Sequence, residues 1–95
     1  MKKIINGKLY DTETAEEIFS EDCVNCGNFS GTDDLFVTKK GTFFVASFSN
    51  GQDLYRSSGL ELIGDKEAAL EWLSGREITN EECEKLGKLG LIIEG

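Results

Sequence analysis

The chain has 95 residues, of which 39% are hydrophobic, and its 10 basic and 18 acidic side chains give a net charge of −8. This length suffices for one small domain, and we expect residues 1–95 to form a single compact unit with a thin core. No apolar run approaches the roughly 20 residues that span a bilayer, and Asn6, Gly7 and Lys8 interrupt the apolar stretch that an export signal requires. We therefore expect a protein of the reducing cytoplasm.

The first part of the chain predicts a hairpin followed by a helix. The asparagine-glycine pair at positions 6 and 7 lies between two short β-prone runs, the strongest local sign of a tight hairpin. A capping residue at position 11 or 12 precedes Ala15, Ile18 and Phe19, whose i, i+3, i+4 spacing is typical of one helical stripe. We therefore predict a short N-terminal helix from about Thr12 to Phe19.

The middle of the chain predicts a loop and then a second hairpin. The stretch from Ser20 to Asp34 is rich in asparagine and glycine, which favour turns, and we expect a loop there. Leu35–Thr38 and Thr42–Phe48 are rich in aromatic and β-branched residues and flank a K-K-G turn. In the second strand, alternation places Phe44, Ala46 and Phe48 on one face and Phe43, Val45 and Ser47 on the other.

The last part predicts a loop, a strand and two helices. A glycine- and serine-rich loop over residues 49–59 leads to a strand at Leu60–Ile63. Asp65 is placed to cap a helix that runs to about Ser74 and ends at the next glycine. The sequence T-N-E-E at 79–82 is a capping box that opens a second helix to about Leu86, which the glycines at positions 87 and 90 then break. The expected fold class is α+β: a small antiparallel β-sheet with one short N-terminal helix and two C-terminal helices.

The negative charge is concentrated in one segment. Residues 11–34 contain eight acids and no base, while the rest of the chain has ten of each, so this segment carries the whole net charge. Such a segment is either a solvated face that keeps the protein soluble or a surface that meets a positively charged partner. The candidate partner-binding residues are Asp11, Glu13, Glu16, Glu17, Glu21, Asp22, Asp33 and Asp34. Direct nucleic-acid binding is not expected, because the sequence shows no basic patch to neutralise phosphates.

The three cysteines, Cys23, Cys26 and Cys83, form a candidate structural zinc site. A C-x-x-C turn lets two thiolates reach one metal ion, and the glycine that follows it suits a zinc knuckle. Cys83 lies in the first turn of the second C-terminal helix, where free N–H groups favour a thiolate. Because the chain has no histidine and no fourth cysteine, the fourth ligand is expected to be water or a carboxylate, from Asp11, Asp22, Asp33, Asp34, Asp53 or Glu82.

Two other interpretations of the cysteines stay open, namely partly buried free thiols and a disulfide or redox pair. A redox C-x-x-C usually lies at a helix N-terminus, whereas this pair lies among carboxylates, which disfavour thiolates when no metal is bound. The lack of histidine also removes the conventional base for a nucleophilic cysteine. The sequence contains neither a glycine-rich phosphate loop nor a G-x-S-x-G motif, and we expect no enzymatic activity.

Three stretches carry a resemblance to a protein family. They are "KKIINGKLYDTETAEEI", "DDLFVTKKGTFFVAS" and "SSGLELIGDKEAALEWL", which together make up more than half of the chain. In the same order, they resemble a group of small proteins found in Firmicutes, their phages and other mobile elements. Some members of that group look like anti-CRISPR proteins, in particular inhibitors of type II effector nucleases. The "CVNCG" stretch departs from the group's general pattern.

The resemblance and the charge pattern predict the same kind of function. CRISPR effectors hold guide and target nucleic acid in positively charged channels. We therefore expect an inhibitor that binds such an effector nuclease through its acidic surface and blocks DNA binding without catalysis, braced by structural zinc, in the cytoplasm of a bacterial host. Two alternatives stay open: a zinc-stabilised adaptor or regulatory module that binds a host protein, and a small thiol-redox protein.

Overall fold

The computed structural model describes residues 1–25, 27–49 and 58–92, and in this part of the chain six strands precede two helices. They are β1 (Lys2–Ile5), β2 (Lys8–Asp11), β3 (Glu16–Asn25), β4 (Asn28–Val37), β5 (Phe43–Ser49), β6 (Gly59–Gly64), α1 (Lys66–Leu73) and α2 (Asn80–Lys88). The expected α+β class and the two C-terminal helices are confirmed. Most of the loop expected at 49–59 lies outside the described residues.

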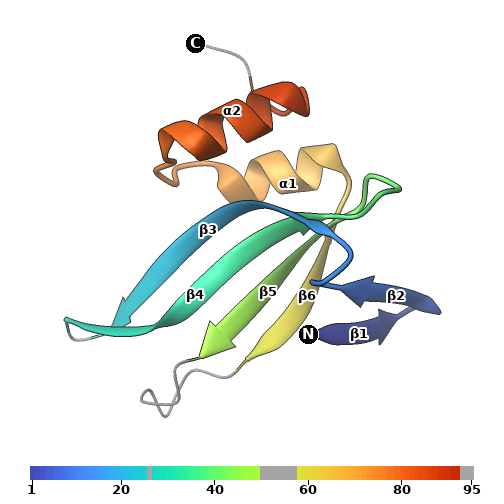
Figure 1. Cartoon of the computed structure of the whole chain (residues 1–95), viewed down its shortest axis with the longest axis horizontal. Coiled ribbons are helices and arrows are strands. Elements are labelled where there is room, and N and C mark those ends of the chain that lie inside the picture. Colours follow the sequence, from blue (N-terminus) through green and yellow to red (C-terminus); the bar gives the residue numbers. More distant parts are fainter. Residues whose placement is uncertain (26, 50–57, 93–95) are drawn as a thin grey trace.

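The architecture is a four-stranded antiparallel sheet with a cover on each face (Figure 1). Its strands lie in the order β3-β4-β5-β6. On one face α1 and α2 enclose a core of Ile18, Phe19, Leu35, Val37, Phe43, Val45, Ala69, Leu73, Leu86 and Leu91. On the other face the β1–β2 hairpin closes a second core of Tyr10, Phe36, Phe44, Ala46 and Leu60. The alternation predicted for β5 is confirmed, because Phe43 and Val45 belong to the first core and Phe44 and Ala46 to the second.

The first hairpin forms as predicted. Asn6 and Gly7 have positive φ angles of 51° and 76°, which a two-residue turn of the favoured hairpin type requires at both central positions. The flanking residues Ile5 and Lys8 pair directly across the strands.

The predicted helix from Thr12 to Phe19 is wrong. The Ala15 amide donates to the Asp11 carbonyl and closes a single turn, after which β3 begins. A β-bulge in β3 lets the consecutive side chains of Ile18 and Phe19 both enter the helix-side core. Ala15 packs against the hairpin-side core instead. The i, i+3, i+4 spacing therefore belongs to a turn followed by a bulged strand, and the three residues do not share a face.

The stretch that we expected to be a loop is a long β-hairpin. β3 and β4 have 10 residues each and pair Glu21 with Asp33 and Cys23 with Gly31. Gly27, with a φ of 81°, lies in the turn between them. β4 also pairs with β5 along most of its length, and these ladder hydrogen bonds outweigh the low strand propensity of glycine and aspartate.

The two helices begin as predicted, but α2 ends later. The Asp65 side chain accepts a hydrogen bond from the Ala68 amide at 3.0 Å, and the capping box at the start of α2 is complete. Gly87 lies inside α2, so the predicted break at this residue is wrong. Gly90, with a φ of 72°, ends the helix, and the Leu91 amide donates to the Leu86 carbonyl. This pattern is a Schellman motif, whose apolar contact here joins two buried leucines.

α2 also covers part of the open edge of the sheet. The amide of Ser20, in the edge strand β3, donates to Glu82 Oε2 at 2.7 Å. Glu82 Oε1 accepts from the Thr79 amide at 2.9 Å, which closes the capping box. Lys85 Nζ donates to the Glu17 carbonyl at 3.4 Å. The Glu82 carboxylate therefore caps the start of α2 and also bonds this helix to a sheet edge that would otherwise be open to pairing with another strand.

We expect Glu82→Ala to lower the free energy of unfolding by about 1–2 kcal/mol, because it removes both a helix cap and a hydrogen bond to the sheet edge. Urea denaturation followed by circular dichroism measures this loss. Glu84→Ala, at an exposed position of the same helix, is the matched control and should change stability by less than about 0.5 kcal/mol. Equal losses in both variants would contradict the assigned role of Glu82.

Candidate functional site

Two of the eight candidate partner-binding acids are buried. Asp11 is 7% exposed, and its carboxylate accepts from the Glu13 amide at 2.9 Å and lies 3.9 Å from Lys2 Nζ. Asp34 is 8% exposed and accepts from the Ser20 hydroxyl at 2.6 Å. Both side chains join neighbouring segments of the fold, so neither is placed to meet a partner.

Two further acids are engaged on the helix side of the sheet. Glu21 pairs with Arg76, whose guanidinium carbon lies 3.8 Å from the centre of the Trp72 ring. Asp33 is half-buried, and its carboxylate accepts from the Ser47 hydroxyl at 2.8 Å. Arg76 offsets the charge of Glu21, which reduces its contribution to an acidic surface.

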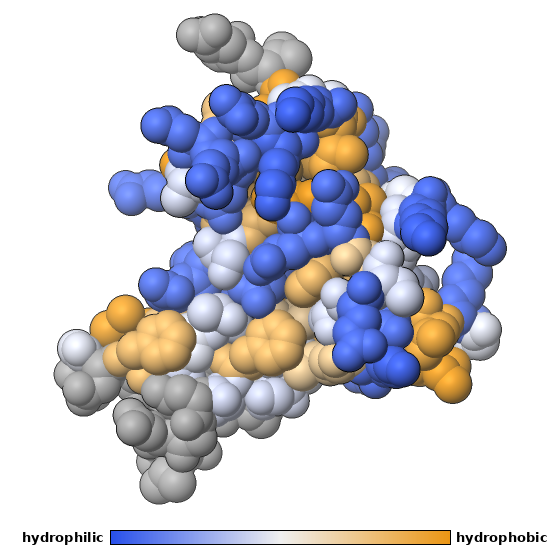
Figure 2. Space-filling model, viewed as in Figure 1, coloured by the Kyte–Doolittle hydropathy of each residue, from blue (hydrophilic) through white to orange (hydrophobic). Residues whose placement is uncertain are grey.

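The remaining four acids are exposed and follow the edge strand and the turn before it: Glu13, Glu16, Glu17 and Asp22. Beyond them, Val24 and Phe29 face each other across β3 and β4 near the tip of the hairpin and are 65% and 49% exposed. Figure 2 shows hydrophobic side chains at this end of the molecule, at the lower left. The register places Glu16 opposite Val37, on the helix side of the sheet, and Asp22 opposite Thr32, on the hairpin side, so the acids lie on both sides of the sheet edge. This acidic edge with an apolar end is the first candidate surface.

Glu17 lies in a hollow of about 160 Å³ between β3 and α2. Partial burial of its carboxyl group raises the pKa of Glu17 above the ordinary value of 4.5; the Asp34 and Glu82 carboxylates raise it further, and Lys85 lowers it. The folded protein therefore holds this proton more tightly than the unfolded chain does. It follows that the Glu17 contribution to stability falls as the pH rises from 4.5 through the raised pKa.

We expect Glu17→Gln to be more stable than the parent protein at about pH 7, because glutamine cannot ionise. The gain should stay below about 1 kcal/mol, since solvent screens a largely exposed group. It should vanish at about pH 3.5, where Glu17 is protonated in both the folded and unfolded states. Thermal unfolding at both pH values tests this, with Glu16→Gln, the exposed neighbour, as control; a gain that persists at low pH would contradict it.

Two of the three predicted zinc ligands lie in different secondary-structure elements, and the third is not described. Cys23 lies in β3, and its thiol donates to Asp33 Oδ2 at 3.3 Å. Cys83 is exposed in the first turn of α2. Cys26 lies outside the described residues. Within residues 1–25, 27–49 and 58–92, no three side chains of metal-ligating type gather closely enough to hold an ion.

Zinc binding by Cys23, Cys26 and Cys83 stays a prediction. It requires one zinc ion per chain in native mass spectrometry after purification with metal present, and loss of that ion in Cys23→Ser. Ser74→Ala, at an exposed position at the end of α1, is the control that should keep the metal. A metal-free mass for the parent protein would end the hypothesis.

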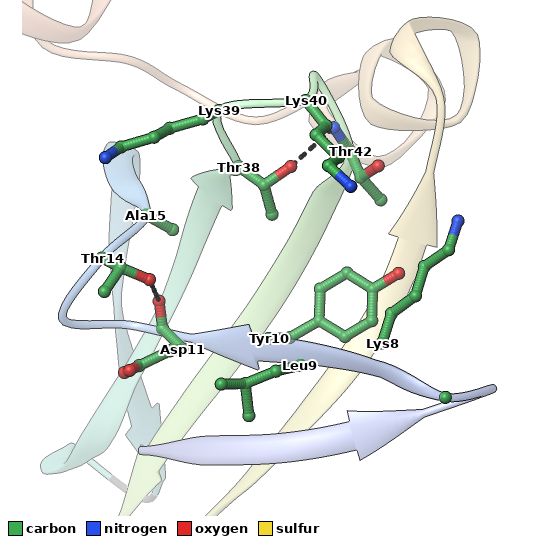
Figure 3. Close-up of a pocket in the computed structure, with 11 residues that line it drawn as sticks. Lys8, Leu9, Tyr10, Asp11, Thr14, Ala15, Thr38, Lys39, Lys40 and Thr42 are labelled. Carbon is green, nitrogen blue, oxygen red and sulfur yellow. Dashed lines mark hydrogen bonds between the residues drawn. The ribbon is translucent and has the colours of Figure 1, made fainter.

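A second candidate site is a pocket of about 400 Å³ between the β1–β2 hairpin and the β4–β5 turn (Figure 3). The hairpin and the turn that follows it contribute Gly7, Lys8, Leu9, Tyr10, Asp11, Thr14 and Ala15, and the β4–β5 turn contributes Thr38, Lys39, Lys40 and Thr42. The Tyr10 ring packs edge-on against Phe44, with ring centres 5.6 Å apart, and is buried. The pocket therefore has a rigid aromatic wall.

Sequence reasoning missed this pocket. Its three lysines belong to the N-G-K and K-K-G turns, which are 30 residues apart, and each turn by itself is an ordinary solvated loop. Only the packing of the β1–β2 hairpin on the sheet brings Lys8 to the same opening as Lys39 and Lys40. The lysines at two separate turns were the available signal, but nothing in the sequence showed that the turns meet.

No protein-family model, curated protein or solved structure matches the chain in the comparisons. In the described ranges, no helix has the length and apolar character needed to cross a bilayer.

Proposed function

We propose that this protein is a non-enzymatic inhibitor that binds a basic protein surface through the outer side of β3 and the tip of the β3–β4 hairpin. The proposed target is a type II CRISPR effector nuclease, the partner suggested by the resemblance of the N-terminal, central and C-terminal stretches to anti-CRISPR proteins. The observation that carries the proposal is the set of exposed carboxylates along the edge strand β3, beyond which lies an exposed apolar pair.

The charge of this surface favours a basic partner. β3 and β4 contain no basic residue, and the exposed acids from Glu16 to Asp22 span about 20 Å along the strand at roughly 3.3 Å per residue. Like charges spread along a sheet edge on this scale attract a positively charged groove and speed association with it. Such attraction weakens as salt is added, since exposed charges are screened over about 8–10 Å.

The apolar tip of the hairpin supplies binding energy that charge alone does not. Interfaces gain most of their binding energy from a few desolvated apolar or aromatic anchors, whereas rim charges chiefly set rate and specificity. Val24 and Phe29 lie opposite each other in the ladder and are exposed at the end of the hairpin. We propose that they insert into the partner while the carboxylates occupy part of its nucleic-acid channel.

Guide-directed DNA cleavage by a panel of type II effectors tests the proposal. We expect inhibition when the protein is added before the target DNA and little when it is added after, because the surface competes for the channel. Reversing Glu13, Glu16 and Asp22 to lysine should raise the inhibitory concentration at least about tenfold. Val24→Ser with Phe29→Ser should weaken inhibition by a similar factor.

The matched control reverses three exposed acids elsewhere, Glu71, Glu77 and Glu84, which changes the net charge equally. This variant should inhibit like the parent protein. Equal loss in both reversal variants would mean that total charge, and not the β3 surface, is responsible. No inhibition by the parent protein across the panel would overturn the proposed target.

A further inference from the structure

The lysines around the pocket are not neutralised by the protein. Among the contacts of the described residues, no carboxylate pairs with Lys8, Lys39 or Lys40, although the chain as a whole carries a charge of −8. The lining carboxylate of Asp11 is buried and lies beside Lys2. Figure 3 shows the three lysines around the rim of the pocket, with the ammonium groups of Lys8 and Lys39 on opposite sides. Because lysine side chains are long and flexible, these groups can turn toward the opening and give it a positive potential in an acidic protein.

Hydroxyl groups supply neutral donors at the same place. The Tyr10 ring is buried, yet no hydrogen bond joins its hydroxyl to any described residue, and no buried polar side-chain atom in the described ranges is without a partner. The hydroxyl therefore reaches solvent, and Figure 3 shows it pointing into the space between Lys8 and Thr42. Thr38 Oγ1 accepts from the Thr42 amide at 3.1 Å, which leaves its own O–H available to donate.

The size and surroundings of the pocket indicate the class of ligand. A volume of about 400 Å³ lies in the range of roughly 300–1,000 Å³ that small-molecule sites occupy. Lysine binds phosphate as a point charge, and an aromatic wall suits an apolar or planar body. Glu13 and Glu16 adjoin the lining residues Thr14 and Ala15 and are exposed, so they repel a long polyanion that extends past the opening.

We propose that the pocket between the β1–β2 hairpin and the β4–β5 turn binds a phosphorylated small molecule of about nucleotide size. Lys8, Lys39 and Lys40 contact its phosphate groups, the Tyr10 hydroxyl donates to one phosphate oxygen, and the Tyr10 ring lines the site of the ligand's body. The proposal does not depend on the inhibitor function, because the residues that would hold the ligand, Lys8, Lys39, Lys40 and Tyr10, are not part of the inhibitor surface.

Titration of the full chain, followed by amide chemical shifts and by calorimetry, tests this site with ADP, inorganic pyrophosphate, adenosine and a short oligothymidylate as separate probes. We expect ADP and pyrophosphate to bind and to shift the amides of residues 7–10 and 38–42, with adenosine much weaker. Lys39→Gln with Lys40→Gln should weaken ADP binding about tenfold or more, and Tyr10→Phe should weaken it severalfold with the fold retained.

The control Lys66→Gln with Lys88→Gln removes two exposed lysines from the helices and should leave ADP affinity unchanged. Equal weakening by this control would overturn the proposal, because total charge would then explain binding. So would equal affinity for adenosine and ADP, or no binding of ADP and pyrophosphate. Tighter lysine-dependent binding of the oligothymidylate than of ADP would also overturn it, in favour of a nucleic-acid backbone contact.

Discussion

The whole fold depends on a sheet that is apolar on both faces. Phe44, in β5, is fully buried. Its ring stacks on the Phe36 ring, with the two ring centres 5.3 Å apart, and meets the Tyr10 ring edge-on. The residues next to it along the strand, Phe43 and Val45, point into the opposite core. A two-faced sheet needs two covers, and a chain of 95 residues provides small ones: an eight-residue and a nine-residue helix on one side and two four-residue strands on the other.

The edge strand β3 links this architecture to the proposed inhibitor surface. Its inward side chains complete the helix-side core, and Glu82 and Lys85 of α2 bond to its backbone near the start. The exposed acids Glu16 and Asp22 discourage pairing of the edge with another strand, because like charges on approaching edges repel. The same charges are attractive to a basic partner, so protection of the edge and the proposed recognition use the same residues.

The fold also separates charge. The exposed acids lie along β3 and the turn before it, whereas Lys8, Lys39 and Lys40 gather where the β1–β2 hairpin meets the β4–β5 turn. A protein with a strongly negative net charge therefore has one positively charged opening among its described residues. The two proposed sites act on ligands of opposite charge. Variants of Lys39, Lys40 and Tyr10 examine the pocket without changing the acids of β3, whereas reversal of Glu13 and Glu16, which adjoin the lining residues Thr14 and Ala15, also changes the potential of the pocket.

Local patterns in the sequence determined the elements whose signals lie within a few residues. These include the turn at Asn6 and Gly7, the alternation along β5 and the caps at Asp65 and Thr79, because each depends on backbone chemistry at one place. The tertiary structure decided the rest. Pairing between β3 and β4 made a long hairpin from the end of the predicted helix and the whole of the predicted loop, and a bulge at Ile18 put two consecutive side chains into one core. Packing likewise buried Asp11 and Asp34 and brought distant lysines to one pocket, because these outcomes depend on contacts between segments that no local pattern contains.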